Sequence, residues 1–554
     1  MPTHQVNLDS LILRQPLDSE SDSSVPGHEP LFKLEELHHT KMYFRLLRKP
    51  DFQRETASWP PAMIVEFVKT FLDGGLIPSI IVWHSKKTNN VFTIDGAHRI
   101  SALIAWVNDD YGNGEISQKA WDHAVPEAHQ NLHKQTKRLM DETIGSYAQL
   151  YDFGLNPEKT ADEEKRRRGK AIATMQLSIQ KVDGDATVAE ESFYKINSSA
   201  VAIDDTELDI IRGRRKPNAI TTRAILYKGK GYKYWANFTN AAQIESMAAT
   251  AYTLLFGDLL EIGPKSPDLP RAGQPYSSQA FKMVLDFVNF FNGVTPAMWT
   301  HKATKTTKTK SVPRLPDDVN GTATEEYIQK VIDTASLVSG PAEASQSLGL
   351  DQAVYAYDAS GKVHPAAFIA HHKFAEELKE KDQMVGFTVV RKQFEEFIVG
   401  HKVFLNRLGH SKGSRTKPLT AILTMYRAIL KAIDKGITSD SDIIKELETY
   451  SDLSSIQNSL LGSEDAEETT TKKFSKAAVR AKLVSEVLET RARCAVCGAR
   501  LPPSCRSKDH INKAEHDGIG SVDNLQFTHP FCNSARDKIE AVQATTKGQL
   551  PLVD

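Results

Sequence analysis

The sequence predicts an α+β protein of several domains. Its 554 residues, 25% of them charged, suffice for three or four soluble domains of about 100–200 residues each. Helical and extended patterns alternate near the amino terminus, helical periodicity dominates the middle, and all four cysteines lie after residue 490. These observations predict an α+β domain, a mainly α-helical domain and a small metal-binding domain, in that order.

The amino-terminal domain is expected over residues 31–215. Residues 1–30 are rich in Ser, Asp and Pro, and we predict a tail without fixed structure there. Apolar spacing indicates a helix, two strands and a second helix, which cover 63–72, 77–83, 91–94 and 100–107. Another strand-like run is expected from residue 180, before a helix that begins at the capping-box pair Asp204 and Glu207.

A helical middle domain is predicted over residues 216–455. Its clearest helical patterns cover 278–293, 366–380 and 418–435. The basic stretches 302–310 and 410–417 are interpreted as flexible loops, which serve either surface solubility or contact with a phosphate backbone. An acidic linker is expected over 456–471, and a basic helix opens the carboxy-terminal domain, 472–554.

Composition restricts the compartment and the role of the cysteines. No basic start followed by an apolar run, and no stretch of about 18 apolar residues, is present, so we expect a cytoplasmic protein without membrane insertion. In a reducing compartment four clustered cysteines favour metal ligation over disulfides. The net charge of −1 does not by itself indicate a nucleic-acid binder.

The cysteine pattern predicts a structural zinc site. Cys494 and Cys497 provide two thiolates at knuckle spacing, and His529 with Cys532 repeats that spacing downstream. Together they form a closed Cys3His ligand set. Cys505 is the alternative fourth ligand, and unrelated buried thiols are the alternative to a metal site.

Between the two cysteine pairs lies a pattern that suits phosphodiester hydrolysis. His510 can accept a proton from water near neutral pH, so it is the candidate general base. Asp509 precedes it in an extended stretch, points to the opposite side and can ligate a hard cation such as Mg²⁺ or Mn²⁺.

The run from Cys494 through Asp509-His510-Ile511, Asn524 and His529 to Cys532-Asn533 resembles the HNH (ββα-metal) endonuclease family. The resemblance implies that Asn533 is the second protein ligand of the catalytic cation. It places Asn524 at the middle position, where the side chain would hold the loop and orient His510. His529 departs from the family pattern, which usually has Cys there.

A second motif, Asp95-Gly96-Ala97-His98-Arg99, lies at a predicted strand-to-helix turn. Amide groups at a helix N-terminus point toward an anion, Gly96 permits close approach, and Arg99 can pair with phosphate oxygens. The alternative is a local role, with Asp95 capping the helix and Arg99 in a surface ion pair.

With Gln53-Arg54, Trp59, the strand entry at 76–80 and the Phe193-to-Asn197 segment, this motif resembles the DUF262 family, which includes GmrSD-type phage-defence nucleases. The resemblance covers about 40–215 and implies a ParB/sulfiredoxin-like fold that binds or hydrolyses a nucleotide. It assigns the nucleotide to a set of residues that comprises Gln53, Arg54, Asp95, Gly96, His98, Arg99 and Asn197. Trp59 and Phe193 are interpreted as core aromatics.

Two departures limit this resemblance. Ala97 replaces the usual Gln, and Ala200 stands near a common Gly, so binding is better supported than hydrolysis. Ala97 also stands where sulfiredoxins carry their reactive Cys, which excludes a sulfinic-acid reductase because the nucleophile is missing.

The two resemblances together predict an anti-phage or restriction DNA endonuclease. An NTP-binding amino-terminal domain would control a metal-dependent HNH domain that cuts phage or modified DNA, with a homo-oligomer or an operon partner as further associations. The alternative is a ParB-like DNA-binding regulator in which the HNH domain binds without cleaving.

Overall fold

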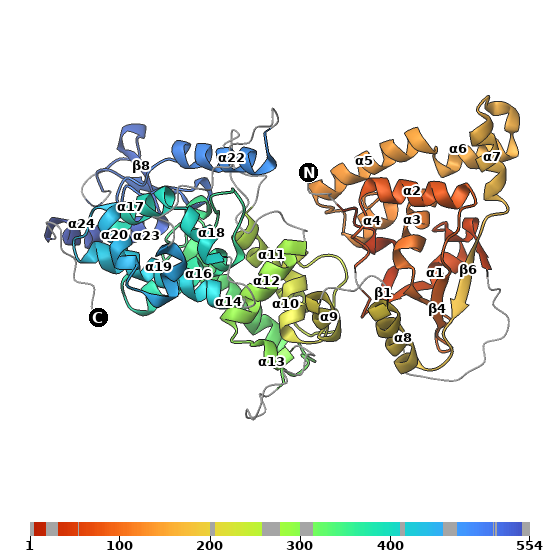
Figure 1. Cartoon of the computed structure of the whole chain (residues 1–554), viewed down its shortest axis with the longest axis horizontal. Helices are drawn as coiled ribbons and strands as arrows, with labels where there is room; N and C mark the ends of the chain where they lie inside the picture. The colour runs from red at the N-terminus through yellow and green to blue at the C-terminus, as the bar shows by residue number, and fades with distance from the viewer. Residues whose placement is uncertain are drawn as a thin grey trace. The chain divides into compact units, whose positions relative to one another are not determined.

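The computed structural model describes ten stretches of the chain, which are 5–17, 31–53, 55–199, 205–257, 278–299, 314–409, 416–457, 474–513, 515 and 518–545. The chain folds into two compact units (Figure 1). The first unit comprises 1–219, 230–236 and 296–317, and the second comprises 220–229, 237–295 and 318–554. All six tryptophans therefore belong to the first unit.

The first unit contains a mixed six-stranded sheet. Its order is β1 (Leu13–Gln15), β3 (Leu47–Pro50), β5 (Val91–Asp95), β4 (Ile80–His84), β6 (Gln176–Lys181) and β2 (Leu31–Lys33). The pairs β1–β3, β3–β5 and β4–β6 are parallel, whereas β4–β5 and β2–β6 are antiparallel. The mixed sheet with its helices confirms the predicted α+β class.

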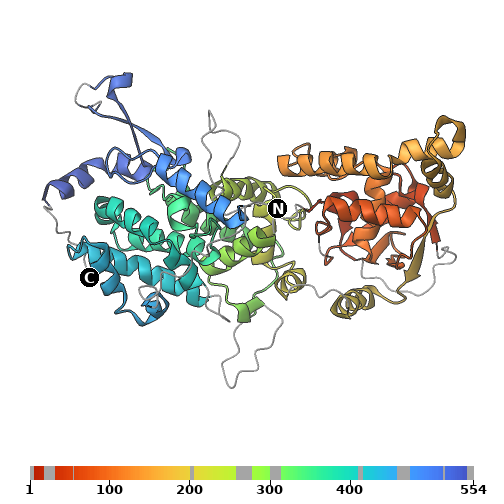
Figure 2. The same ribbon diagram turned by 45° about the horizontal axis from the view of Figure 1, so that its top comes forward.

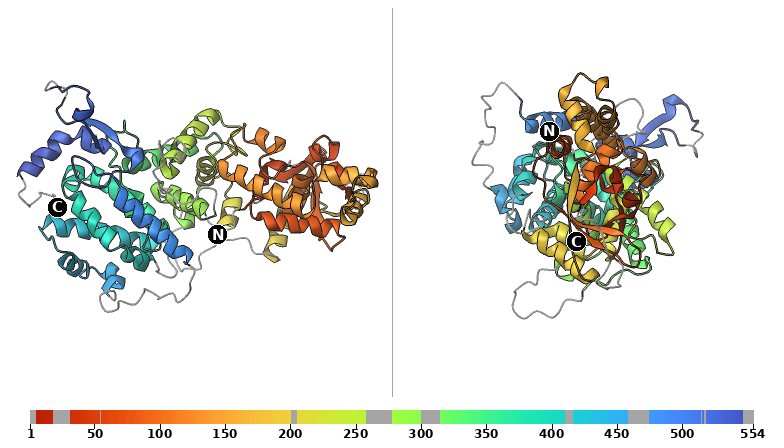
Figure 3. Two further views of the ribbon diagram at one scale, coloured as in Figure 1. Left: turned by 90° about the horizontal axis from the view of Figure 1, so that it is seen from above. Right: turned by 90° about the vertical axis from the view of Figure 1, so that its right-hand side faces the viewer.

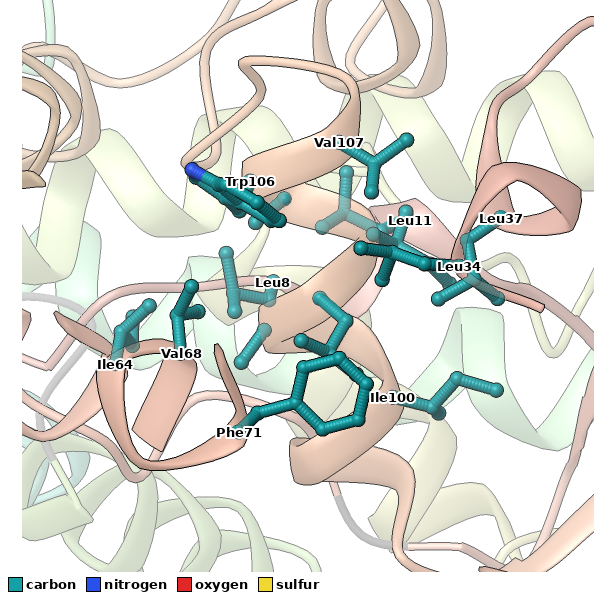
Figure 4. Packing of buried hydrophobic residues seen from close by; sticks show 14 of the residues in the cluster. Leu8, Leu11, Leu34, Leu37, Ile64, Val68, Phe71, Ile100, Trp106 and Val107 are labelled. Atoms are coloured by element: carbon teal, nitrogen blue, oxygen red, sulfur yellow. The ribbon is translucent and has the colours of Figure 1, made fainter. Parts of the chain in front are cut away.

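The first unit also contains helices. In chain order they are η1 (Asp9–Leu11), η2 (Leu34–Leu37), α1 (Met42–Leu46), α2 (Pro61–Leu72), α3 (Ala97–Val107), α4 (Glu115–Ala120), α5 (Glu127–Thr143), α6 (Tyr147–Leu155), η3 (Pro157–Lys159), α7 (Glu163–Ile172), α8 (Ala186–Ser199), α9 (Asp205–Arg212) and α13 (Pro296–Trp299). Helix α10 (Pro217–Leu226) has residues in both units. Apolar side chains of α2 and α3 meet those of η1 and η2 in the main core (Figure 4).

Part of the predicted amino-terminal tail is ordered, which corrects the expectation for residues 1–30. Residues 5–17 form η1 and β1, and β1 pairs in parallel with β3. Val6, Leu8, Leu11 and Ile12 are buried in the main core. These apolar residues outweigh the polar composition of the stretch, because their burial offsets the entropy of ordering it.

The patterns around the central motif are confirmed, whereas the later strand is displaced. The predicted helices 63–72 and 100–107 correspond to α2 and α3, and the strands to β4 and β5. The strand expected from residue 180 is β6, which begins at Gln176, and α8 follows it directly.

Several predicted features lie outside the described residues. They are the capping residue Asp204, residues 458–471 of the linker, and the basic stretches 302–310 and 410–415.

The second unit is mostly helical, as predicted for the middle of the chain. Its helices are α11 (Ala241–Phe256), α12 (Ser278–Phe291), α14 (Thr322–Ser339), α15 (Gln352–Tyr355), α16 (Pro365–Glu380), α17 (Met384–Gly400), α18 (Val403–Gly409), α19 (Thr416–Asp434), α20 (Asp440–Leu447), η4 (Ser451–Leu453), α21 (Ser454–Gln457) and α22 (Lys476–Thr490). Helices α12, α16 and α19 match the three predicted ranges. None of the described helices is long and apolar enough to cross a membrane.

A small hairpin and two short helices complete the second unit. They are η5 (Pro503–Cys505), β7 (Ser507–His510), η7 (Val522–Asn524), β8 (Leu525–Thr528), α23 (Pro530–Ser534) and α24 (Arg536–Thr545). Strands β7 and β8 are antiparallel and extend away from the helices of this unit (Figures 2 and 3). Residues 472–554 thus share one compact unit with most of the predicted middle domain.

Candidate functional site

A pocket of about 170 Å³ opens where β5 ends and α3 begins in the first unit. Gly96 joins the two elements in the left-handed conformation, with φ of +89°. L side chains rarely adopt this conformation, so the turn favours glycine, and a Cβ atom there would also lie 2.5 Å from Ile80 Cδ1. The first amides of α3 have no intrahelical acceptors and form the natural anion-binding end of the helix. The pocket lining comprises Gln53, Trp59, Ile94, Asp95, Gly96, Ala97, His98, Arg99 and Phe193.

Arg99 is held by an ion pair inside this pocket. Its Nη2 lies 2.5 Å from Asp95 Oδ2, and its Nη1 donates to the Pro78 carbonyl at 2.8 Å. Asp95 does not cap α3, because no side-chain hydrogen bond caps that helix. The predicted phosphate-binding arginine therefore shares its guanidinium with a carboxylate of the same motif.

His98 is positioned by residues that precede α2. Its Nε2 lies 2.7 Å from Ser58 Oγ, and its ring lies 5.7 Å from the Trp59 ring, centroid to centroid. Trp59 and Phe193, which we expected to be core aromatics, both line the pocket. Phe193 is nevertheless buried in a small apolar cluster, so it combines the two roles.

A buried network fixes the loop that carries Gln53. Asp9 Oδ1 accepts hydrogen bonds from Arg14 Nη2 at 2.8 Å, Lys49 Nζ at 2.7 Å and the Thr56 amide at 3.0 Å. Burial raises the pKa of Asp9, but Arg14 and Lys49 outweigh it and hold that pKa well below its usual value. Arg14 Nη1 also donates to the Gln53 carbonyl. The loop is therefore preorganised.

The second candidate site lies on the β7–β8 hairpin. Asp509 pairs with Gln526 and His510 with Leu525 in the antiparallel register. Side chains alternate along a strand, so Asp509 and His510 face opposite sides. Asp509 is buried and His510 is half-buried.

Asp509 has two partners that the sequence analysis did not identify. Gln526 Nε2 donates to Asp509 Oδ2 at 2.7 Å, and Arg536 Nη1 lies 3.3 Å from the same oxygen. Arg536 Nη1 also donates to the His510 carbonyl at 2.6 Å. The antiparallel register alone would place a residue of β8 opposite Asp509, which is the signal that could have indicated Gln526.

The two asparagines hold the backbone on either side of the hairpin. Asn524 Nδ2 donates to the carbonyls of Asn512 at 3.0 Å and Ile519 at 2.8 Å, and Asn524 Oδ1 accepts from the Asn512 amide. Asn533 Nδ2 donates to Ser507 Oγ at 2.8 Å and to the Lys508 carbonyl at 3.1 Å. Both bonds of Asn533 use nitrogen, which leaves its amide oxygen for another ligand.

Cys494, Cys497, His529 and Cys532 converge in a buried cluster, hereafter the Cys3His cluster. Their ligand atoms all lie within 4.8 Å of one another. His529 Nδ1 lies 3.5 Å from Cys497 Sγ and 3.6 Å from Cys532 Sγ. Tetrahedral zinc with Zn–N and Zn–S bonds of usual length would place these atoms about 3.6 Å apart. The donor set therefore fits zinc.

The surroundings of the Cys3His cluster favour the same ligand set. His529 Nε2 donates to the Arg500 carbonyl at 2.9 Å, so Nδ1 is left as the ligand atom. Hydrogen bonds from Cys497 and Cys532 hold the pKa of the Cys494 thiol far below its usual value. Cys505, the alternative ligand, is buried outside the cluster and lies 3.8 Å from Ser504 Oγ.

The helical part of the second unit packs directly on the Cys3His cluster. The Phe531 amide donates to the Ser347 carbonyl at 2.9 Å. Gly349 has φ of +57°, and a Cβ atom there would lie 2.8 Å from His529 Cδ2. Arg391 is fully buried and donates to the Gly349 carbonyl at 2.9 Å and to Glu395 at 2.7 Å. The cluster is therefore part of the core between helices and hairpin.

Residues 34–212 match the family described as the GmrSD restriction endonuclease, N-terminal domain. Residues 34–212 of the first unit are thus similar to a GmrSD-type amino-terminal domain, and this part of the chain is hereafter called the GmrSD-type domain. This match confirms the predicted resemblance of the amino-terminal part and does not extend to the β7–β8 hairpin. No curated protein and no solved structure matches the chain.

Within the GmrSD-type domain the structure assembles five of the seven predicted nucleotide-site residues. Gln53, Asp95, Gly96, His98 and Arg99 line one pocket. Arg54 lies outside the described residues. Asn197 belongs to α8, but its side chain lies outside the described part.

Gln53 has an unusual environment in this GmrSD-type domain. It is 5% exposed, and its Oε1 has no hydrogen-bond partner among the described residues. Its Nε2 makes one long contact of 3.5 Å to the Ile94 carbonyl. A buried acceptor without a donor is costly, and this oxygen is able to accept a hydrogen bond from a ligand.

Proposed function

We propose that the chain is a restriction-type DNA endonuclease in which a GmrSD-type domain controls an HNH nuclease site. The observation that carries the proposal is the family match over 34–212, because the matched domain is that of a restriction endonuclease. The β7–β8–α23 arrangement beside the Cys3His cluster supports a nuclease site at the other end of the chain.

His510 is the proposed general base. A half-buried imidazole can accept a proton from water near neutral pH, and its strand is fixed by pairing with β8. The Asn524 side chain donates to the carbonyls of residues 512 and 519, which lie in the segment after His510. These hydrogen bonds hold that segment against the start of β8 and keep the base in place.

Asp509 and Asn533 are the proposed ligands of a catalytic Mg²⁺ or Mn²⁺. Both hydrogen bonds of the Asn533 side chain use its nitrogen, and Asp509 contributes a buried carboxylate, so the donor set suits a hard cation. Such a cation would stabilise the negative charge that develops on the phosphate. Zinc in the Cys3His cluster would serve the fold and not the reaction.

The pocket of the GmrSD-type domain is the proposed NTP site. The open end of α3 and Arg99 suit phosphate oxygens, and the Gln53 oxygen suits a donor on the base or ribose. Arg99 would exchange its bond to Asp95 for a bond to phosphate. We propose that this pocket binds an NTP and, as a second step of the proposal, that it hydrolyses the NTP.

A plasmid-cleavage assay tests the nuclease. The wild-type protein should cut DNA with Mg²⁺ and fail with EDTA, and His510→Ala should abolish cutting while zinc content and fold persist. The exposed His123→Ala serves as the matched control. Unchanged cutting by His510→Ala refutes the assignment of His510 as the general base. A wild-type protein that binds DNA without cutting it supports the alternative of a ParB-like DNA-binding regulator. Plain and modified phage DNA, each with and without NTP, reveal the substrate and the control.

Calorimetry with NTPs tests the nucleotide site. Arg99→Ala should weaken binding, whereas Arg138→Ala should not. Arg138 is a suitable control because it forms an i,i+4 pair with Glu142 at 3.7 Å that is exposed. A wild-type protein that binds no NTP refutes this part of the proposal.

A further inference from the structure

We infer that Arg536 and Gln526 are positioning residues that orient Asp509 toward the catalytic cation and fix the strand end at His510. The inference rests on the proposed nuclease function. It concerns two residues to which the sequence analysis assigned no role.

Both partners of Asp509 bind the same carboxylate oxygen. Gln526 Nε2 and Arg536 Nη1 lie 2.7 and 3.3 Å from Oδ2, respectively. The Asp509 side chain is 9% exposed, so it has little freedom to rotate away from these donors. Oδ1 makes neither of these contacts, and it is the oxygen that remains for a cation.

Arg536 also connects Asp509 to the backbone of the candidate base. Its Nη1 donates to the His510 carbonyl at 2.6 Å, and its Nη2 donates to the Ile511 carbonyl at 3.3 Å. Its Nε donates to Glu540 at 2.7 Å, which holds the guanidinium from the helix side. One side chain of α24 thus sets the carboxylate and the strand end together.

The planar guanidinium is required for this arrangement. Arginine presents five donors in a fixed fork, whereas a lysine ammonium at the same place is a flexible point charge. Lysine would preserve the charge beside Asp509 and lose the simultaneous contacts to both carbonyls. Residues that orient metal ligands typically change metal affinity or activity by about 10- to 100-fold when they are removed.

Mn²⁺ binding, followed by electron paramagnetic resonance on the full-length, zinc-loaded protein, tests the inference. Asp509→Ala defines the signal of this site, because the wild-type signal minus that of the variant belongs to Asp509. Arg536→Lys and Gln526→Leu should each weaken Mn²⁺ binding about 10-fold or more and raise the Mn²⁺ concentration for half-maximal cleavage. Zinc content and the circular dichroism spectrum should not change.

Lys538→Gln is the matched control, since Lys538 is exposed on the same helix and has no role in the inferred contacts. Its Mn²⁺ affinity should equal that of the wild type. Wild-type affinity in both Arg536→Lys and Gln526→Leu overturns the inference, and so does an equal loss in Lys538→Gln. A wild-type protein that neither cleaves nor shows an Asp509-dependent Mn²⁺ signal overturns the proposed function itself.

Discussion

Substitution of Gly349 by alanine should destabilise the second unit through the Cys3His cluster. The backbone of Gly349 is fixed from two sides, because its carbonyl accepts from Arg391 and its amide donates to Ser347 Oγ at 3.3 Å. The new Cβ atom would lie 2.8 Å from His529 Cδ2 and 3.0 Å from Cys505 Cβ. The imidazole must therefore move, and its Nδ1 moves with it.

The expected cost has two parts. The left-handed conformation, with φ of +57°, costs an alanine about 1–2 kcal/mol. Overpacking against the ring and Cys505 adds about 1–3 kcal/mol. Gly293→Ala isolates the first part, because Gly293 has φ of +68° and nothing lies within 4 Å of its Cβ position. The two variants should thus differ by about 1–3 kcal/mol, or on the order of 2–6 °C in the unfolding midpoint.

Zinc release on heating, detected with a chromogenic chelator, reports the second unit. Tryptophan fluorescence reports the first unit in the same sample, since all six tryptophans belong to it. Gly349→Ala should release zinc at a lower temperature than Gly293→Ala and leave the fluorescence transition unchanged. Equal zinc-release temperatures in the two variants would refute the packing argument.

Two further predictions concern buried charges of the second unit. Arg491→Met should lower the free energy of unfolding, measured by urea denaturation, by about 3–5 kcal/mol, because it removes the ion pair of 2.8 Å from the 2%-exposed Asp351 carboxylate. The double variant Arg491→Met/Asp351→Asn should regain most of the lost stability, because it also removes the buried charge. Burial lowers the pKa of Lys402 to about 7 in the folded protein, against about 10.4 unfolded. Between these values the unfolded state binds more protons, so stability should rise with pH from about 7 to about 10, and Lys402→Met should remove that slope.

Local patterns predicted the elements around the Asp95 motif and much of the helical part. Helix α2 could be predicted from the spacing of its apolar residues and from Asp73-Gly74-Gly75, which ends it. Both signals lie within one short stretch of sequence. Strand β6 was displaced because only Leu177 in it is buried, and the strand depends on pairing with β4 and β2. Such pairing joins residues about a hundred or more positions apart and leaves little local signal.

Some residues of the candidate sites could likewise be predicted from local sequence patterns, whereas others could not. The four cluster residues were identified because each pair keeps a knuckle spacing in the sequence. Arg536 was missed because its contact with Asp509 arises only when α24 returns to the end of β7. Arg99 forms the ion pair that the local alternative expected, here with Asp95, and its role toward phosphate stays a prediction.

The interleaving of the two units limits where the chain can be divided. Residues 230–236 belong to the first unit although they follow a segment of the second. Trp235 is fully buried there, and the Tyr234 hydroxyl donates to the Asp51 carbonyl at 2.9 Å. A fragment that ends near residue 215 would include the whole family match and still lose these contacts. During synthesis, the ribosome must likewise release residues beyond the matched domain before the contact between Tyr234 and Asp51 can form.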